Sequence, residues 1–397
     1  METVVLRLKG ESRLYLGSYD TQFHEEDPFR AQSLKGLWRY WLRAYIAGAM
    51  YDAGILKCER KGEYVCKSDL KKVVEKTGYL LGSLESASKF RIVVSKASAR
   101  RREDGFRAQR ARLLSLGRRR ISYGEGAYAE IKIEKSPHVE KLGENEVKLA
   151  IGSLLTALSL NGLGKGGRRG LGTFSVEVDG FEGRFLKNKR IDYSMIRELI
   201  GETLRSARSY LNLGKGNPSE IPPVDCISEA KIDLSGINGS TNLFNKKEVP
   251  VFTVIRAKPR SRKDIETMVI ELQDFFYRPE RSRKMGFMIS SADKSQDPIT
   301  RGRLAWFLGL PRTQKGTGYL DAERRASPVH LAVHENEALF TLFLSGDWPT
   351  EIRWKGIGRP VPLRIDLSKV KEAYLTSISS LEGYLDRIGY ETEVIFP

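Results

Sequence analysis

The spacing of apolar residues in the first half of the chain predicts four strands and two helices. Alternating or short continuous apolar runs, which are typical of strands, occur in residues 3–9, 90–94, 127–133 and 173–178. Apolar residues recur every three or four positions, as on one face of a helix, in residues 33–50 and 147–158. Ser33 is expected to cap the first of these helices. The order β-α-β-β-α-β is that of a ferredoxin-like domain.

The second half repeats this order more loosely. Its expected strands are residues 251–257, 329–334, 338–344 and 393–396, and its expected helices are residues 263–276 and 367–388. An additional amphipathic helix is expected at 191–213, followed by a proline-containing linker at 214–250.

We therefore predict an α+β fold of two ferredoxin-like (βαββαβ, RRM-like) domains packed together, with helical and loop insertions. The N-terminal domain would span 1–185 and carry an arginine-rich insertion at 96–124. The C-terminal domain would span 186–397 and include the additional helix and the linker.

Composition favours a folded chain rather than a disordered or membrane-anchored one. Of 397 residues, 40% are hydrophobic and 29% are charged, which is enough for a substantial core. No apolar run reaches the roughly 18 residues of a membrane span, and the alternating start is not expected to be a signal peptide. Three cysteines are too few for a disulfide framework and form no zinc pattern, so a cytoplasmic location is expected.

Positive charge is concentrated in three segments. The formal net charge is +17, and residues 30–45, 87–120 and 165–172 together account for all of it. Residues 87–120 alone contain twelve lysines or arginines against two acidic residues. Clustered cations beside an otherwise balanced chain indicate a binding site for a polyanion, most often a nucleic acid. A generally basic surface is the alternative.

The first predicted helix carries one cationic stripe. Lys35, Arg39 and Arg43 are spaced four residues apart and share a face, and no acidic residue lies between Arg30 and Ala49. Such a stripe fits a line of phosphates. Trp38 at its edge could stack on a base, although its spacing favours a place in the core.

A glycine-rich loop at 162–172 is the second candidate site. It contains six glycines and the cations Lys165, Arg168 and Arg169 without any acidic residue. Glycine permits positive φ and close approach to a ligand, and exposed N–H groups bind phosphate. The loop is neither a Walker A motif nor a dinucleotide fingerprint, because it follows a helix and opens a strand. A tight helix-to-strand turn is the alternative.

The remaining cations of interest lie in basic loops. They are Arg101 and Arg119 in the insertion, and Arg283, Lys284, Arg301, Arg303 and Arg325 in the second half. The insertion is too rich in charge for a packed element, so we expect an arm that contacts either nucleic acid or an acidic protein. Short basic runs are also typical of solvated surface.

Catalytic candidates are few. Among the four histidines, His330 and His334 lie in a strand-like pattern that does not suit a shared metal ion. His24, in an acidic loop, could act as a general acid in RNA cleavage or be an exposed loop residue. We therefore expect a binding protein with no catalytic residue, no metal site and no cofactor.

Two motifs resemble those of a known family. Ser33-Leu34-Lys35-Gly36-Leu37-Trp38-Arg39-Tyr40-Trp41-Leu42-Arg43 looks like the first-helix signature of the RAMP superfamily of CRISPR-associated proteins, and Gly162–Gly172 resembles its glycine-rich loop. Leu16-Gly17-Ser18, Gly309-Leu310-Pro311 and Arg324-Arg325-Ala326-Ser327-Pro328 are similar to segments of the first RAMP subunit of type III-B (Cmr) RNA-silencing complexes.

The resemblance implies a non-catalytic subunit that binds guide RNA and target RNA near the 3′ end of the guide. Its partners would be the other Cmr subunits, and no membrane would be involved. The six cations of the first helix and the glycine loop would face the RNA. Two alternatives stay open: a metal-independent endonuclease that processes CRISPR transcripts, and a scaffold that docks acidic subunits.

Overall fold

The structure is a computed structural model of the 397-residue chain. It describes residues 3–16, 29–59, 62–102, 106–108, 111, 122–124, 126–216, 218, 220–277, 298–309, 318–320, 325–355 and 361–397. Four of the predicted site residues or candidates lie outside these ranges, namely His24, Arg119, Arg283 and Lys284.

A six-stranded antiparallel sheet forms the core of the first half. Its strands are β1 (Val4–Gly10), β2 (Phe90–Ser98), β5 (Tyr128–Lys135), β6 (Phe174–Asp179), β7 (Leu186–Lys187) and β8 (Arg190–Ile191), in the order β2-β5-β1-β6-β8-β7. Buried and less buried residues alternate along β1, so Val4, Leu6 and Leu8 all point to one face. That face is the apolar one on which the helices pack.

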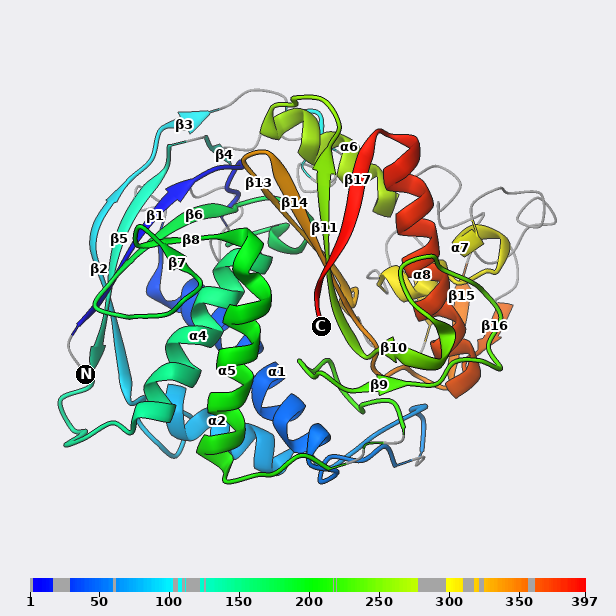
Figure 1. The fold of residues 1–397 in the computed structure, drawn as a ribbon, viewed down its shortest axis with the longest axis horizontal. Helices are drawn as coiled ribbons and strands as arrows, with labels where there is room; N and C mark the ends of the chain where they lie inside the picture. Colours follow the sequence, from blue (N-terminus) through cyan, green and yellow to red (C-terminus); the bar gives the residue numbers. More distant parts are fainter. Residues whose placement is uncertain are drawn as a thin grey trace.

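Four helices accompany this sheet. They are α1 (Ala31–Asp52), α2 (Lys71–Leu81), α4 (Glu144–Leu160) and α5 (Ile196–Leu211). In α4, every residue from Leu149 to Leu160 is buried, so this helix is enclosed on all sides. Figure 1 shows the reason: α1, α4 and α5 lie between the first sheet and a second sheet.

The second sheet has four antiparallel strands. They are β11 (Phe252–Pro259), β13 (Val329–His334), β14 (Glu337–Phe343) and β17 (Tyr390–Phe396), in the order β13-β14-β11-β17. All residues of β13 and β14 are buried, because the helix layer covers one face and α6 (Ile265–Tyr277) and α8 (Leu367–Arg387) cover the other. The molecule is thus a sheet–helix–sheet–helix arrangement.

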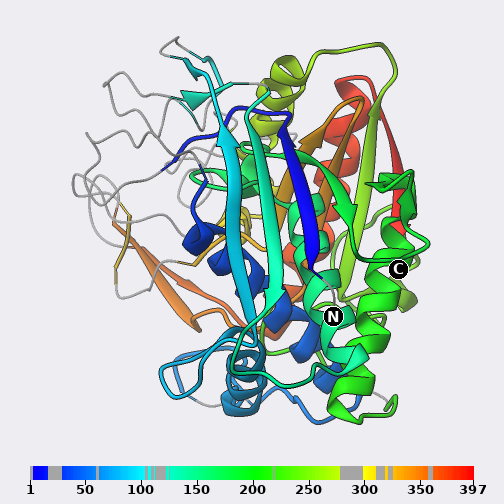
Figure 2. The same ribbon diagram turned by 90° about the vertical axis from the view of Figure 1, so that its left-hand side faces the viewer.

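Short elements complete the described chain. They are the strand pairs β3 (Arg101–Arg102) with β4 (Ser122–Tyr123) and β9 (Lys231–Ile232) with β10 (Val249–Pro250), the small sheet β12 (Gly318–Leu320), β15 (Glu351–Lys355) and β16 (Val361–Arg364), and helix α7 (Pro298–Arg301). Figure 2 looks onto the outer face of the first sheet, where no described helix lies over β1, β2 and β5.

The structure confirms a mixed α and β fold and corrects several details. Helix α1 begins at Ala31 rather than at Ser33, and no side chain caps it. Helix α2 and the small sheet β12–β15–β16 were not predicted. Strands β7 and β8 follow residue 185 but pair with the first sheet, and α5 packs against α4. Cys58 and Cys66, expected to be reduced, form a disulfide with a Cα–Cα distance of 5.2 Å.

Candidate nucleic-acid interface

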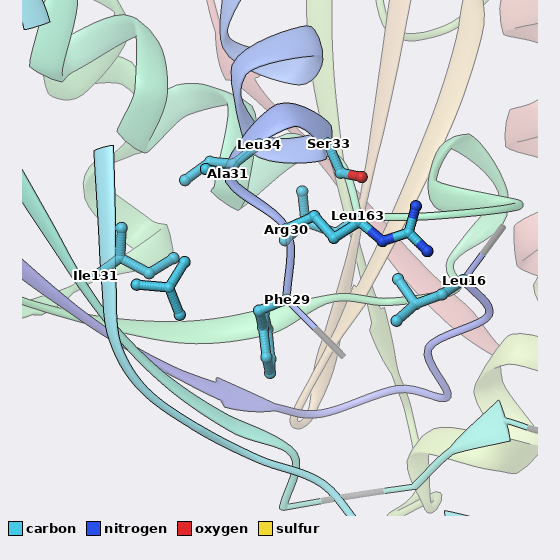
Figure 3. A pocket seen from close by; sticks show the side chains of 9 residues that line it. Leu16, Phe29, Arg30, Ala31, Ser33, Leu34, Ile131 and Leu163 are labelled. Atoms are coloured by element: carbon cyan, nitrogen blue, oxygen red, sulfur yellow. The ribbon is translucent and has the colours of Figure 1, made fainter. Parts of the chain in front are cut away.

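Helix α1 and the glycine loop lie side by side. The guanidinium of Arg168, in the loop, lies 4.4 Å from the centre of the Tyr40 ring, in α1. Leu163 of the loop and Leu34 of α1 also line one small pocket, shown in Figure 3. The two cationic segments that the sequence singled out are therefore in contact with each other.

Two cations of α1 have side chains without a described polar partner. Arg43 is exposed and Lys35 is half-buried, and neither side chain has a hydrogen bond or ion pair among the described residues. Partial burial and the neighbouring charge of Arg39 both lower the pKa of Lys35. The first turn of α1 contains no acidic residue. Its helix dipole therefore adds to the positive potential at this end.

Arg39, the third member of the predicted stripe, has a structural partner. Its Nη2 donates hydrogen bonds to the carbonyl oxygens of Leu81 at 2.9 Å and Gly82 at 2.8 Å. These groups lie at the C-terminus of α2, where carbonyls have no partner within the helix. Arg39 thus joins α2 to α1, and only part of its donor capacity remains for a ligand.

Trp38 belongs to the core. Its side chain is fully buried, its Nε1 donates a hydrogen bond of 2.7 Å to the carbonyl of Ala150 in α4, and its ring packs on Phe90. A base cannot reach this ring in the described structure. The predicted stacking role is therefore replaced by a packing role.

The glycine loop is a tightly packed turn between the two halves. A Cβ at Gly162 would lie 1.9 Å from the carbonyl oxygen of Leu171, and one at Gly167 would lie 2.1 Å from the carbonyl oxygen of Gly162. The N–H of Gly170 donates to the carbonyl of Leu331 in β13 at 2.8 Å. These close approaches require glycine. The backbone of the loop is thus the tight turn that was the alternative prediction. Its cations are Lys165, Arg168 and Arg169.

The three cations of the loop differ in their surroundings. Arg169 donates to the carbonyl oxygens of Val329 at 2.8 Å and Leu308 at 3.2 Å, and lies 3.8 Å from the centre of the Phe276 ring. It therefore ties the loop to the second half. Lys165 is half-buried. Arg168 is held by its ring contact, which leaves its N–H donors directed to neither a carboxylate nor a carbonyl among the described residues.

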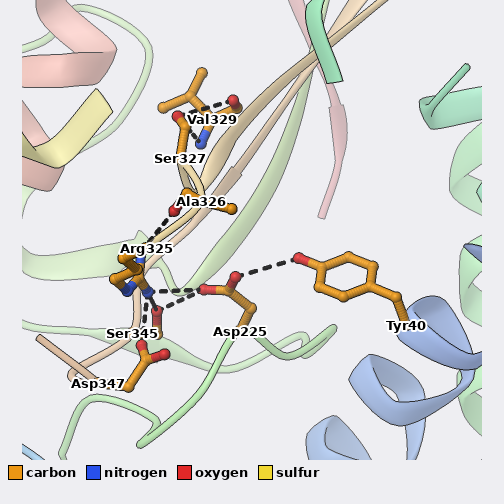
Figure 4. Close-up of polar contacts among 8 residues, drawn as sticks. All are labelled: Tyr40, Asp225, Arg325, Ala326, Ser327, Val329, Ser345 and Asp347. Atoms are coloured by element: carbon orange, nitrogen blue, oxygen red, sulfur yellow. Dashed lines mark hydrogen bonds and ion pairs between the residues drawn. The ribbon is translucent and has the colours of Figure 1, made fainter. Parts of the chain in front are cut away.

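A polar network from the second half of the chain contacts Tyr40 (Figure 4). Its hydroxyl donates to Asp225 at 3.2 Å, and Arg325 contacts Asp225 at 3.3 Å and Asp347 at 2.6 Å. Burial, and secondly the charge of Asp225, raise the pKa of Tyr40. Arg325 is only 11% exposed at its side chain. Its role here is to neutralise two aspartates, so its predicted contact with RNA is not supported by its position.

Both described core histidines have structural environments. His330 is buried beside Tyr40, Trp41 and Phe343; burial, followed by the charge of Arg168, lowers its pKa. His334 contacts Glu11 at 2.7 Å. Burial alone would lower the pKa of His334, but this carboxylate raises it overall.

Part of the charge on the outer face of the first sheet is paired. Arg7 pairs with Glu130 at 3.5 Å and also with Asp179, which in turn pairs with Lys189 at 2.5 Å. This face would be the binding platform of an RRM. Residues 30–49 and 162–172 carry cations and no acidic residue, so the side at α1 and the loop is the better candidate for a polyanion.

Three further predicted residues are exposed. Arg101 lies in β3, Arg301 ends α7, and Arg303 follows that helix with φ of 56°. Their roles as RNA contacts stay predictions. In the described part of the chain, no cluster of three metal-ligating residues occurs, and no helix is long and apolar enough to cross a membrane.

Sequence reasoning missed Tyr40 and Asp225. Tyr40 lies three residues before Arg43 and so borders the stripe, which could have indicated its position beside the cations. Asp225 lies in the proline-containing linker, and nothing in the sequence connects it to Tyr40.

Comparison with protein families finds a similarity over the first part of the chain. Residues 7–175 match the model of the RAMP superfamily. This range contains both motifs that suggested the family, so the first part of the chain is similar to RAMP superfamily proteins. A search of curated proteins finds no match.

Solved structures show which proteins share the fold of this chain. Cmr1 from Pyrococcus furiosus in its apo form is 16% identical, with a TM-score of 0.53 over 100% of this chain and 99% of that one. A chain of a type III-B Cmr-beta complex bound to cognate target RNA is 14% identical, with a TM-score of 0.51 over 96% and 100% of the two chains. Another Cmr-beta structure, bound to cognate target RNA and AMPPnP in the presence of ssDNA, gives 14% identity and a TM-score of 0.53 over 96% and 99%. The whole chain thus shares the fold of these Cmr chains.

Proposed function

We propose that this chain is a non-catalytic RNA-binding subunit of a type III-B CRISPR effector complex. It would bind guide RNA and target RNA near the 3′ end of the guide and assist target capture in antiviral defence. One observation carries the proposal: Arg168 on Tyr40 joins the cations of the glycine loop to those of α1. Two of the solved structures with this fold come from complexes described as bound to cognate target RNA, which supports it.

The chemistry of this surface favours phosphates over bases. Lys35, Arg43 and Arg168 are cations without carboxylate partners among the described residues, whereas Trp38 is buried. Phosphate contacts position a nucleic acid but do not read its sequence. Binding should therefore depend weakly on sequence and strongly on salt.

The two halves are proposed to be ferredoxin-like domains. In the first sheet, the strands of the β-α-β-β-α-β unit are arranged β2-β5-β1-β6, and in the second β13-β14-β11-β17. Numbered within each unit, both orders are 2-3-1-4, which supports the same topology for both. The proposed boundary at residue 185 places β7 and β8 in the C-terminal domain by their position in the sequence. In space, both strands extend the sheet of the N-terminal domain.

Partners and setting belong to the same proposal. The other subunits of the Cmr complex would contact the chain, no metal or cofactor would be needed, and the complex would act in the cytoplasm. Salt-sensitive association with acidic subunits in the absence of any affinity for RNA would instead favour the scaffold.

Fluorescence anisotropy with labelled single-stranded RNA tests the proposal. We expect saturable binding, and intact RNA after prolonged incubation of the pure protein in EDTA. Discrete cleavage products that disappear in His24→Ala would favour the endonuclease. An absence of binding to guide, target and their duplex would contradict the proposed function.

A further inference from the structure

A glycine lies on the exposed face of α1 where the fold does not require one. Gly36 is the sixth residue of this 22-residue helix and is exposed, and a Cβ built there meets no described atom within 4 Å. Gly48 on the same helix is different, because its Cβ would lie 1.6 Å from the carbonyl oxygen of Ile227. Glycine in a helix interior is destabilising relative to alanine. Packing therefore explains Gly48 but not Gly36.

The neighbours of Gly36 are those of the candidate interface. Arg39, Tyr40 and Arg43 are three, four and seven residues further on, so they lie on the same face of the helix as Gly36. Lys35 precedes it, and Arg168 lies on the ring of Tyr40. The gap left by the missing side chain is thus bordered by cations.

We infer that Gly36 is the point at which the sugar–phosphate backbone of an RNA strand packs directly against the main chain of α1. This inference rests on the proposed function. Without a Cβ at this position, a phosphate or ribose can approach the helix backbone and reach the flanking cations on both sides at once. A side chain here would hold the strand away from the helix and lengthen those contacts.

Gly36→Ala tests this inference, with Gly383→Ala as a matched control. Gly383 lies in α8, is also exposed, and also has no described atom within 4 Å of a built Cβ. Both variants should have a melting temperature equal to or above that of the wild type, since alanine favours the helix. Only Gly36→Ala should bind RNA more weakly, by about tenfold, and Gly36→Leu should bind more weakly still.

The outcomes separate this inference from the proposed function. If the wild type does not bind RNA, the proposed function fails first. If the wild type binds and Gly36→Ala binds equally well, the close approach at Gly36 is wrong. A lower melting temperature for Gly36→Ala would show that another part of the chain fills this space, and would also overturn the inference.

Discussion

The stability of α2 should depend on Arg39, a residue that the sequence alone assigns to RNA binding. In Arg39→Gln, the carbonyls of Leu81 and Gly82 lose their charged donor. Hydrogen bonds to charged groups contribute about 1.5–3 kcal/mol each. Because Arg39 is half-buried and water can replace part of its contacts, we expect a combined loss of about 2 kcal/mol.

Thermal unfolding followed by circular dichroism measures this loss. The entropy of unfolding is about 2.1 cal/mol/K per residue, so 2 kcal/mol should lower the Tm of the chain by about 2–3 °C. Arg43→Gln is the control. Arg43 is exposed on the same stripe and has no described partner, so its replacement should change the free energy of unfolding by less than about 0.5 kcal/mol. Equal stability of the Arg39 variant and the wild type, together with weaker RNA binding, would refute the assignment of Arg39 to α2.

Three other changes test buried contacts within and between the two halves. Arg325→Leu should lower the free energy of unfolding by about 3 kcal/mol in urea titrations, because it leaves Asp225 and Asp347 without a counter-charge; an unchanged midpoint would contradict the network. Gly162→Ala should cost about 4 kcal/mol in the same assay, because its Cβ would overlap the carbonyl of Leu171. His334 has a raised pKa in the folded state, so its contribution is complete below about pH 6.5 and is lost as pH rises through the folded pKa. The Tm difference between wild type and His334→Gln should accordingly be larger at about pH 6 than at about pH 9, and a difference independent of pH would contradict the ion pair with Glu11.

The strands and long helices could be predicted because their patterns are strong. Alternation in β1 follows directly from burial of one face, and the apolar positions of α1 follow from the burial of most of this helix. Helix α2 was missed because it is short and exposes most of its charged residues, with only five of its eleven residues buried. Its existence depends on packing beside α1 and on the cap from Arg39, neither of which a local pattern reveals.

The sequence predicts which segments form the candidate site, but it does not predict what each cation in those segments contacts. Charge and spacing singled out the first helix and the glycine loop, and the structure places these two segments side by side. Whether a cation contacts solvent, a carbonyl or a carboxylate depends on partners far away in sequence. Arg169, for example, is 160 residues from the carbonyl of Val329 that it binds. Arg168, its neighbour, is held by Tyr40 instead.

The salt dependence of RNA affinity tests the central claim most directly. Lys35→Gln, Arg43→Gln and Arg168→Gln would be combined in one variant, and its anisotropy titrations compared with those of the wild type over a range of salt concentrations. Three phosphate contacts to single-stranded RNA should contribute about 2 to the slope of log affinity against log salt. A variant that binds more weakly with a slope reduced by about that amount would support one continuous phosphate track. An unchanged slope and affinity would contradict it.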